Sequence, residues 1–261
     1  MDEILRENQV SSPIRTNVEL SESVKAVDEK LKTNPTNADL WMERGLALAD
    51  MTLFRESVEA FSKAISIDPL CGIYYRHRAH RHLSCWELEE ARADFALAAR
   101  LIPDNWDVWY HYGLSSYLLG EYEKALNAYK VCYEMSKTDD KIVAITDWYW
   151  MTLKRLGLDD EAAKLLEPIT TNMDYGENIA YFSRLMIYKG IDQPQERPLP
   201  DNKDTAIQWV TFTYGLANYY SFIGEKEKSD RLLNQLLEMD KYNLYYAFGY
   251  LAAMVDKGKL K

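Results

Sequence analysis

One short run of arginines and histidines stands out from an otherwise acidic sequence. Residues 76–82 contain three arginines and three of the four histidines, although the whole chain has a formal net charge of −10. Arginine presents a planar fork of donors that fits a carboxylate or a phosphate, and imidazoles add donors whose charge depends on pH. The run therefore predicts a subsite for an anionic group, formed by Arg76, His77, His80 and, farther along the chain, His111.

A structural ion network is the competing interpretation of the same run. In such a network Arg76, Arg78 and Arg81 would pair with acidic residues of neighbouring helices. The candidate acidic partners are Glu43, Asp107 and Asp147. Clusters of charge with perturbed pKa values occur in structural networks as well as in functional sites, so the sequence leaves both interpretations open.

Catalysis and metal binding are further alternatives for the histidines. Asp147 could orient His111 or His77 as a general base, since a base needs a positioned partner and a suitable pKa. No nucleophile motif, glycine-rich phosphate loop or H-E-x-x-H sequence accompanies these residues. His77 and His80 could share a metal with His111 or Asp147, but that ligand set is incomplete. An enzyme is therefore the alternative hypothesis, and neither a metal nor another cofactor is expected.

The elements that position these residues follow from a repeat of 34 residues. Small residues recur at this interval, each followed by a larger apolar residue, and prolines recur at the same interval. The small residues are Ser23, Ser57, Ala91 and Ala125, the larger ones are Val27, Phe61, Phe95 and Tyr129, and the prolines are Pro35, Pro69 and Pro103. Each segment predicts two amphipathic helices, because its apolar residues fall at helical spacings. One such pair cannot bury its apolar face alone, so neighbouring pairs must stack.

The order of these residues resembles the tetratricopeptide repeat (TPR) family, whose pattern is W-x2-L-G-x2-Y, then A-x3-F, A and P. The first full repeat starts at Ala38 and has Trp41, Gly45, Leu48, Ser57, Phe61, Ala64 and Pro69. The second starts at Gly72 and has Tyr75, Ala79, His82, Ala91, Phe95, Ala98 and Pro103. The third starts at Trp106 and has Trp109, Gly113, Ala125, Tyr129 and Cys132, with Ser116 where tyrosine is usual. The resemblance implies an all-α fold, a solenoid of helix-turn-helix units with a concave groove.

The resemblance also implies which side chains line that groove. The groove stripe on each first helix is turned by about 100° from the face that packs on the second helix. The inferred ligand-binding residues are Arg76, His77, His80, Tyr110, His111, Tyr117, Asp147, Trp148, Tyr214 and Asn218. The family's carboxylate clamp does not carry over, because Met42, Leu46, Asp107 and His111 stand where the clamp expects amide or basic residues.

The repeat predicts a single solenoid over residues 18–261, preceded by a flexible polar segment over 1–17. Its expected parts are repeats at 38–71, 72–105, 106–139 and 140–175, an irregular part at 176–204, a repeat at 205–241 and a capping helix at 243–255. The fourth repeat should carry about one extra turn, because its interval is 37 residues. The irregular part predicts a helix from Asn178 to Lys189 and a proline-marked loop over 192–202.

Composition narrows the classes of partner. The acidity argues against nucleic acid, since neutralising phosphates requires a basic face. No apolar run approaches the ~18 residues of a transmembrane helix, and the first residues do not resemble a secretory signal. The three cysteines are odd in number and form no C-x-x-C, which disfavours a disulfide framework or a zinc site. We therefore expect a cytoplasmic protein with no membrane and no nucleic-acid partner.

Together these observations favour a stand-alone TPR binding module. Members of the family usually bind peptides or partner proteins in the groove, so the expected ligand is a peptide or protein segment, or a small molecule, with an anionic group. The alternative is an enzyme or a small-molecule binding protein that uses the histidine, aspartate and arginine residues of the same groove. A third hypothesis is an adaptor that binds a protein over its convex face.

Overall fold

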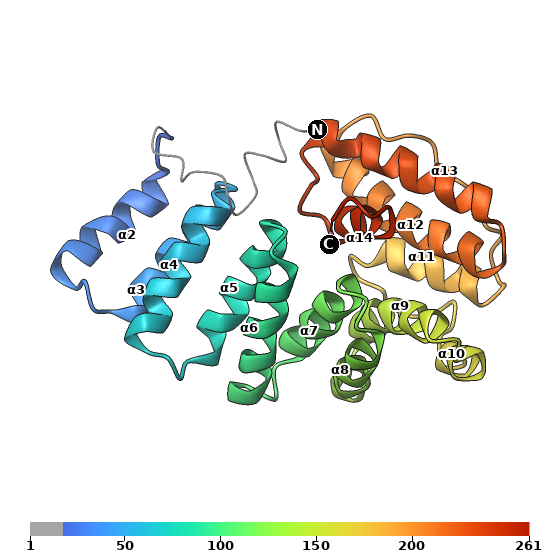
Figure 1. Ribbon diagram of the computed structural model, residues 1–261, viewed down its shortest axis with the longest axis horizontal. Coiled ribbons are helices and arrows are strands. Elements are labelled where there is room, and N and C mark those ends of the chain that lie inside the picture. The colour runs from blue at the N-terminus through green and yellow to red at the C-terminus, as the bar shows by residue number, and fades with distance from the viewer. Residues whose placement is uncertain (1–17, 261) are drawn as a thin grey trace. The chain divides into compact units, whose positions relative to one another are not determined.

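The computed structural model describes residues 18–260, and every regular element in that range is a helix (Figure 1). The predicted all-α fold is confirmed. The chain divides into two compact units, Met1–Ser115 and Ser116–Lys261, and the boundary falls inside α7 (Trp106–Leu118). The predicted flexible segment 1–17 lies outside the described residues. The single solenoid expected over 18–261 stays a prediction.

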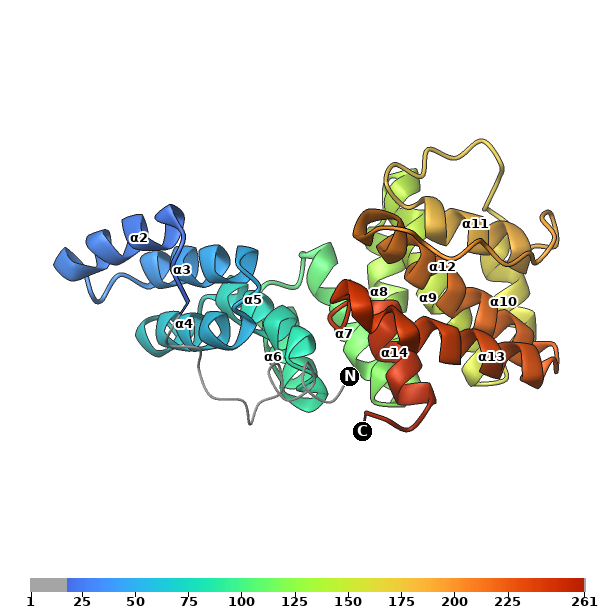
Figure 2. The same ribbon diagram turned by 90° about the horizontal axis from the view of Figure 1, so that it is seen from above.

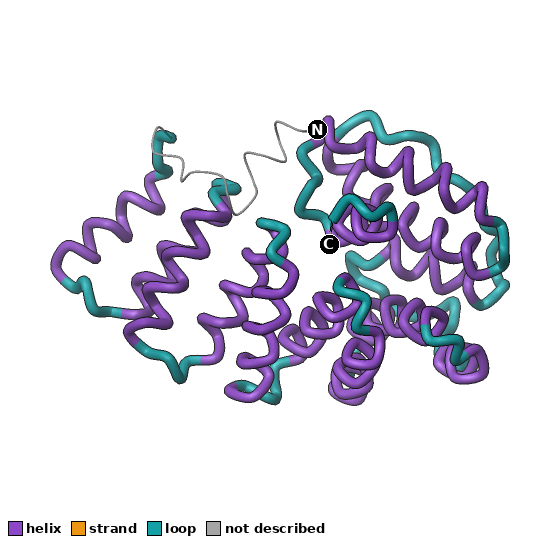
Figure 3. The backbone as a smooth tube through the Cα atoms, in the orientation of Figure 1, coloured by secondary structure: helices purple, strands orange, loops and turns teal. Residues whose placement is uncertain are grey.

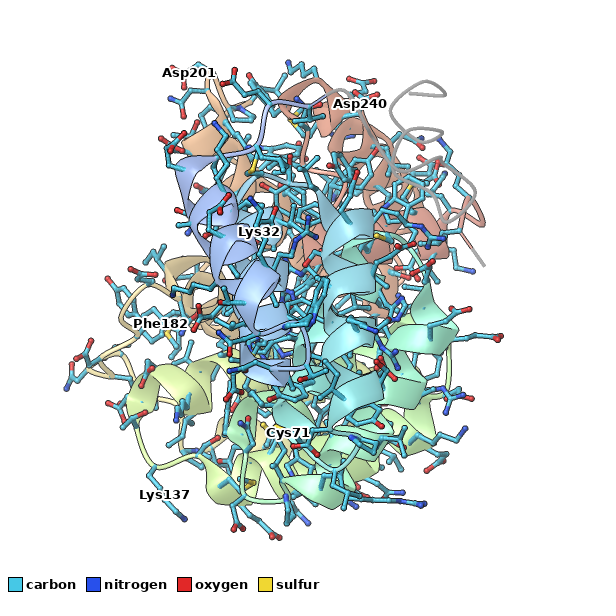
Figure 4. All side chains as sticks on the ribbon, turned by 90° about the vertical axis from the view of Figure 1, so that its left-hand side faces the viewer. Lys32, Cys71, Lys137, Phe182, Asp201 and Asp240 are labelled. Carbon is cyan, nitrogen blue, oxygen red and sulfur yellow. The ribbon has the colours of Figure 1, made fainter. Side chains whose placement is uncertain are left out.

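Unit 1 is built from helices that pack on one another in chain order. The bounds are α2 (Glu22–Thr33), α3 (Ala38–Asp50), α4 (Phe54–Ile67), α5 (Gly72–Ser84) and α6 (Leu88–Leu101), followed by the first part of α7. The strongest packing joins α3 to α4 and α5 to α6, and α4 then packs on α5. Figure 4 looks onto the α2 end of the unit, with Lys32 in the last turn of α2 and Cys71 in the turn before α5.

The pairing of α3 with α4 depends on small residues where the two helices meet. A Cβ atom added at Gly45 would lie 2.6 Å from Cε1 of Phe61, a buried ring on α4. The hydroxyl of Ser57 donates to the carbonyl oxygen of Gly45 over 2.6 Å. In the second pair, Ala79 faces the buried side chains of Ala91 and Phe95 in the same order. The 34-residue period is therefore a period of close helix contacts.

The recurring prolines have a partner at the same interval. The indole Nε1 of Trp41 donates to the carbonyl oxygen of Pro35 over 2.9 Å, and Trp109 does the same to Pro103 over 2.7 Å. Between them, the hydroxyl of Tyr75 donates to the carbonyl oxygen of Pro69 over 3.1 Å. The aromatic residue at the start of each repeat thus fixes the turn that enters it, which explains why both residue types recur together.

The turn inside each helix pair adopts a left-handed backbone at one fixed position. Thr52, Trp86 and Gly120 lie 34 residues apart and have φ values of 58°, 66° and 72°. Glycine adopts this conformation without steric cost, whereas a β-branched residue such as threonine is strained in it. Thr52 is exposed, so its side chain gains little from packing.

Thr52→Gly is therefore expected to raise the free energy of unfolding by about 1 kcal/mol, the approximate cost of a left-handed conformation for a residue with a Cβ. Urea unfolding followed by circular dichroism measures this change. Trp86→Gly at the equivalent turn is the control, and it should destabilise because it also removes a buried indole. A loss of stability in Thr52→Gly would show that the left-handed backbone is not the limiting strain.

Unit 2 continues with shorter and less regular elements. The bounds are α8 (Tyr122–Met135), α9 (Asp139–Arg155), α10 (Asp159–Leu166), α11 (Ile179–Tyr188), α12 (Lys203–Phe222), α13 (Lys226–Leu237), η1 (Glu238–Tyr242) and α14 (Phe248–Asp256). The predicted extra turn lies in α9, which has 17 residues where α3 and α5 have 13. The predicted helix over 178–189 and the loop over 192–202 are both confirmed, and Figure 3 shows that loop in teal after α11.

The last helix is shorter than the expected capping helix. The prediction placed its start at Asn243, but α14 begins at Phe248. Residues Glu238–Tyr242 form a 3-10 helix instead, and Asn243 ends it with a left-handed φ of 57°. Asparagine tolerates this conformation better than most residues, and it breaks the helical path.

Helix α12 is the centre of unit 2. It packs against α11, α13 and α14, and it also touches α9; Figure 2 shows α14 beside α12 and α13. Helix α9 is enclosed by α8, α10 and α11. Every residue from Val143 to Leu153 is buried, as expected for a helix that is covered on all sides. This enclosure decides where the candidate site residues of unit 2 lie.

Candidate functional site

Three of the predicted ligand-binding residues, Arg76, His77 and His80, lie on α5 in unit 1. Nε of Arg76 donates to Oδ2 of Asp107 over 2.6 Å, and its Nη1 donates to Nδ1 of His77 over 3.0 Å. Nη2 of Arg76 makes no hydrogen bond within residues 18–260, and 23% of the side chain is exposed. The arginine is therefore oriented by one carboxylate and keeps a donor that points to no protein group in that range.

The histidines of successive repeats stack on the preceding repeat. The ring of His77 is parallel to that of Phe61 at 5.4 Å between centroids, and His111 stacks on Phe95 in the same way at 5.5 Å. The rings of His80 and His111 meet edge to face at 4.8 Å. His111 is buried, whereas His77 and His80 are partly exposed. Both groove and packing roles therefore fall on this histidine cluster.

Burial sets the charge of the histidines on α5. Desolvation, with a smaller contribution from Arg76 and Arg81, lowers the pKa of His77 to about 4. Burial and the neighbouring His111 also lower the pKa of His80 well below its usual range. At neutral pH these imidazoles are uncharged, so the positive charge at the cluster comes from the arginines.

A buried ion network lies behind this cluster, between α4, α5 and α6. Arg78 donates to both carboxylate oxygens of Asp94 over 2.6 and 2.8 Å. Asp94 also lies 3.7 Å from Nε2 of His82, whose Nδ1 contacts Glu87. Glu87 in turn accepts from Arg55 over 2.9 Å. The network hypothesis is thus confirmed in kind, with partners that differ from the expected ones.

The differences in pairing follow from helix positions. Arg76 pairs with Asp107 as expected, but Arg78 reaches Asp94 on the second helix of its own repeat. Glu43 is 3.4 Å from Lys30, and Asp147 is 2.6 Å from Arg184. His82 is buried and hydrogen-bonded, as its spacing predicted.

The accessible part of the inferred stripe in unit 1 lies on α3 and α5, which touch each other. Leu46 on α3 is 38% exposed, and Met42 is partly buried. One repeat later, the equivalent positions are Arg76 and His80. Tyr110 differs from the expectation of a groove residue, since it is only 6% exposed and its ring stacks on Trp106 at 5.0 Å. An apolar side chain and a cationic side chain therefore continue one stripe across two helices.

In unit 2 the inferred groove residues lie in the interior. Exposure is 3% or less for each of the five: Tyr117, Asp147, Trp148, Tyr214 and Asn218. The expectation that they line an open groove needs correction, because α11 and α12 pack over the face of α9 that the repeat pattern leaves open. Trp148 meets the ring of Tyr117 edge to face at 5.4 Å and stacks on Tyr214 at 5.8 Å. These aromatic residues form part of the core of the unit.

Sequence reasoning missed the arginine around which three of these residues gather. Arg155 donates from Nε to the hydroxyl of Tyr117 over 3.2 Å and from Nη2 to the amide oxygen of Asn218 over 2.7 Å. Its ionic partner is Asp256 on α14, 2.7 Å away, which also accepts from Tyr214 over 3.1 Å. The spacing of four from Met151 to Arg155 carried a signal for this position. Nothing local marks Asp256.

Asp147 belongs to a second buried cluster. Nη2 of Arg184 lies 2.6 Å from Oδ2 of Asp147, and the two side chains are 1% and 0% exposed. Burial raises the pKa of Asp147 to about 7, although the charge of Arg184 opposes this shift. Gly215 on α12 leaves the space that the guanidinium fills, since an added Cβ would overlap Arg184 and lie 2.5 Å from the hydroxyl of Tyr188. Arg184 was also absent from the sequence predictions.

Comparisons with known proteins agree with the repeat geometry. A sequence model of the tetratricopeptide repeat matches residues 38–69 and 107–139, which correspond to the helix pair α3–α4 and to α7–α8. The chain is a tetratricopeptide repeat protein. Residues 70–106, which contain α5, lie between the two matches and carry the arginine and histidine run. The repeat that departs most from the family pattern therefore holds the candidate site.

Related proteins show how far the likeness extends. The "Small glutamine-rich tetratricopeptide repeat-containing protein 2" of Saccharomyces cerevisiae is 30% identical over 103 residues, 40% of this chain and 30% of that protein. This TPR protein therefore spans less than a third of that relative. The crystal structure of YrrB, a TPR protein with an unusual peptide-binding site, has a TM-score of 0.53 at 16% identity and covers 90% of this chain and 99% of its own. A crystal structure of MamA has a TM-score of 0.51 at 22% identity and covers 64% and 86%. The two structures are similar in fold.

The expected catalytic pair has separate partners in this TPR protein. Nδ1 of His111 donates to the carbonyl oxygen of Asp107 over 2.8 Å and lies 3.4 Å from its carboxylate. Asp147 has Arg184. Among residues 18–260, no three histidine, cysteine, aspartate or glutamate side chains are placed to hold a metal ion. In the same range, each helix is too short or too polar to cross a bilayer.

The buried histidines of α5 predict a loss of stability in acid. Because the folded-state pKa of His77 lies below the unfolded value, the unfolded chain binds more protons as the pH falls from about 6.5 to 4. The free energy of unfolding should therefore fall over this range. His77→Phe keeps a ring on Phe61 without a titrating group, and it should show a shallower dependence in urea unfolding at pH 7 and 4.5. Equal slopes for both proteins would contradict the assignment.

Proposed function

We propose that this TPR protein binds a peptide or a partner-protein segment on the face of α3 and α5, and that Arg76, with His77 and His80, holds an acidic group of that ligand. The observation that carries the proposal is the continuous stripe on which exposed Leu46 is followed by Arg76 and His80. A peptide offers both an apolar side chain and a carboxylate, so it matches both halves of this stripe.

The orientation of Arg76 supports this role. Asp107 fixes the guanidinium through Nε, so the arginine loses little conformational freedom when a ligand binds. Its Nη2 keeps a donor that can serve a carboxylate, and a hydrogen bond to a charged group is worth about 1.5–3 kcal/mol. The neutral imidazoles of His77 and His80 add polar contacts without adding charge.

The comparisons support the class of ligand. YrrB, which shares the fold, is described as having a peptide-binding site. The chain's own residues decide the location proposed here, since the aromatic residues inferred for the other half of the groove are buried. The same proposal places the protein in the cytoplasm, where its three free cysteines stay reduced.

Selection of peptides from a random library tests the proposal, followed by measurement of Kd by fluorescence polarisation. The selected peptides should contain an acidic residue. Arg76→Ala and Leu46→Asp should each weaken binding about tenfold or more, as expected for the loss of a charge-assisted hydrogen bond or an apolar contact. The control is Leu97→Asp, because Leu97 is 44% exposed on α6, away from the stripe. It should leave Kd within about twofold.

A second arm tests the acidic group itself. Replacing the acidic residue of the peptide with its amide should weaken binding to the wild-type chain but have little further effect on Arg76→Ala. Additive losses would show that Arg76 does not contact that group. Equal losses for Leu46→Asp and Leu97→Asp would remove the binding face from α3 and α5.

A further inference from the structure

The loop between α11 and α12 has the regularity of a bound peptide. Residues 193–200 form neither helix nor strand and contain Pro194, Pro198 and Pro200. Three of their carbonyl oxygens accept hydrogen bonds from side chains of unit 2. The hydroxyl of Tyr220 donates to Pro194 over 2.8 Å, Nε1 of Trp209 donates to Arg197 over 3.2 Å, and the hydroxyl of Tyr242 donates to Pro200 over 2.8 Å.

These contacts recur every third residue. Positions 194, 197 and 200 are also the least exposed of residues 193–200, whereas the positions between them face solvent. A period of three in both burial and hydrogen bonding is the period of a polyproline II helix, in which every third residue lies on the same side. Domains that recognise such segments use aromatic-lined surfaces. The loop is therefore held in the manner of an extended proline-containing ligand.

Two side chains of the loop add specific contacts. The guanidinium of Arg197 lies 3.8 Å from the ring centroid of Phe212, and its Nη2 donates to the hydroxyl of Ser183 over 2.9 Å. Glu196 accepts two hydrogen bonds from Arg231, over 2.5 and 2.8 Å. A Glu-Arg-Pro sequence is thus recognised by an aromatic face, a hydroxyl and a guanidinium that all belong to the rest of unit 2.

The loop does not fill the surface that holds it. A cavity of about 130 Å³ lies beside Leu199, Trp209 and Leu232, and a second of about 540 Å³ lies beside Pro198, Thr205 and Trp209. Leu199 borders both cavities and is 60% exposed. The surface thus has room for side chains larger than those of the loop. Asp201, which follows the loop, is labelled in Figure 4.

We propose that the surface formed by Trp209, Phe212, Tyr220 and Tyr242 is a binding site for extended, proline-containing peptides of a partner protein, and that residues 193–200 occupy it in cis. The preferred partner sequence contains an acidic residue and an arginine followed by proline, as the loop does. This site lies in unit 2 and is separate from the face of α3 and α5.

Tethering explains why a partner peptide would need to compete. A segment on a short tether has an effective concentration on the order of 1 mM, so an intrinsic Kd of about 0.1 mM gives about 90% occupancy in cis. The tethered segment then weakens a peptide in trans by about tenfold. Removing the segment should therefore strengthen binding of a free peptide by about this factor.

The experiment compares the wild-type chain with a chain in which residues 193–200 are replaced by glycine and serine in equal number. The probe is a fluorescent synthetic peptide of residues 192–202, and binding is measured by fluorescence polarisation. The replaced chain should bind the peptide about tenfold or more tightly than the wild type does. Equal affinity for both chains, or no binding to a folded replaced chain at 1 mM peptide (about ten times the Kd assumed above), would overturn the proposal.

Matched variants locate the site. In the replaced chain, Tyr220→Phe and Tyr242→Phe should each weaken the peptide several-fold, because each removes one donor. Tyr219→Phe is the control, since the Tyr219 hydroxyl makes no hydrogen bond within residues 18–260. In the peptide, alanine at Arg197 should weaken binding and alanine at exposed Gln195 should not. Equal effects of each change and its control would count against the proposal.

Circular dichroism decides whether the replaced chain is folded. If it is unfolded, Glu196→Ala with Arg197→Ala in the full chain takes its place, because it weakens the segment without removing it; the same order of affinities is expected. Concentration-dependent dimerisation that the loop replacement abolishes would mean that the occupant is a second copy of the chain, and would overturn the assignment to a partner protein.

Discussion

Replacing Gly215 with alanine is expected to destabilise the chain by about 3 kcal/mol or more, the cost of breaking a buried ion pair by displacing one partner. The added methyl group would overlap the guanidinium of Arg184, which is 1% exposed and paired with fully buried Asp147. Arg184 also donates from Nη1 to the carbonyl oxygen of Thr211 over 2.8 Å, so it has no free direction in which to move. Urea unfolding of the purified variant measures the loss.

A double-mutant cycle separates this mechanism from general crowding on α12. In an Arg184→Ala background the space opposite residue 215 is open, so Gly215→Ala should be neutral or should stabilise by up to about 1 kcal/mol, the difference in helix propensity. A similar large loss in both backgrounds would show that Gly215 is required for a reason other than Arg184.

Asp94→Ala is expected to destabilise the chain by about 3 kcal/mol, because it leaves Arg78 without its carboxylate in a largely buried network. The side chain of Asp94 is 7% exposed, and it receives both donors of Arg78. The same substitution removes a neighbour of His82. Urea unfolding followed by circular dichroism measures the effect.

The pair between Arg44 and Asp28 is the matched control. Its Nε to Oδ1 distance is also 2.6 Å, but the two side chains are 24% and 32% exposed. Solvent screens such pairs, so Asp28→Ala should cost no more than about 1 kcal/mol. Equal losses for Asp94→Ala and Asp28→Ala would mean that burial of the network contributes nothing to its importance.

The sequence predicts most of unit 1 because its contacts are local to one repeat. Gly45, Phe61 and Pro69 recur at the period of 34 residues because each contacts a partner at a fixed distance along the chain. The stacking of His77 on Phe61 was not predicted, although it recurs in His111 and Phe95. A recurring histidine one position from the groove stripe was the available signal, and it fits both a groove and a packing role.

The interior position of the inferred groove in unit 2 could not be predicted in this way. Trp148 and Tyr214 fall at groove positions by phase, but the phase says nothing of the helices that pack over them. The contacts that bury them join residues far apart in sequence, such as Arg155 with Asp256 and Asp147 with Arg184. Each of these pairs unites a helix of regular phase with one from the irregular part, where no repeat pattern applies.

Hydrogen–deuterium exchange, with and without a selected acidic peptide, tests most directly whether the binding face lies on α3 and α5. Bound peptide should slow amide exchange in Ala38–Asp50 and Gly72–Ser84, because the ligand suppresses local opening of these helices. The Arg76→Ala variant should show no such protection at the same peptide concentration. Protection confined to unit 2, or protection of α3 and α5 that survives Arg76→Ala unchanged, would contradict the proposed site.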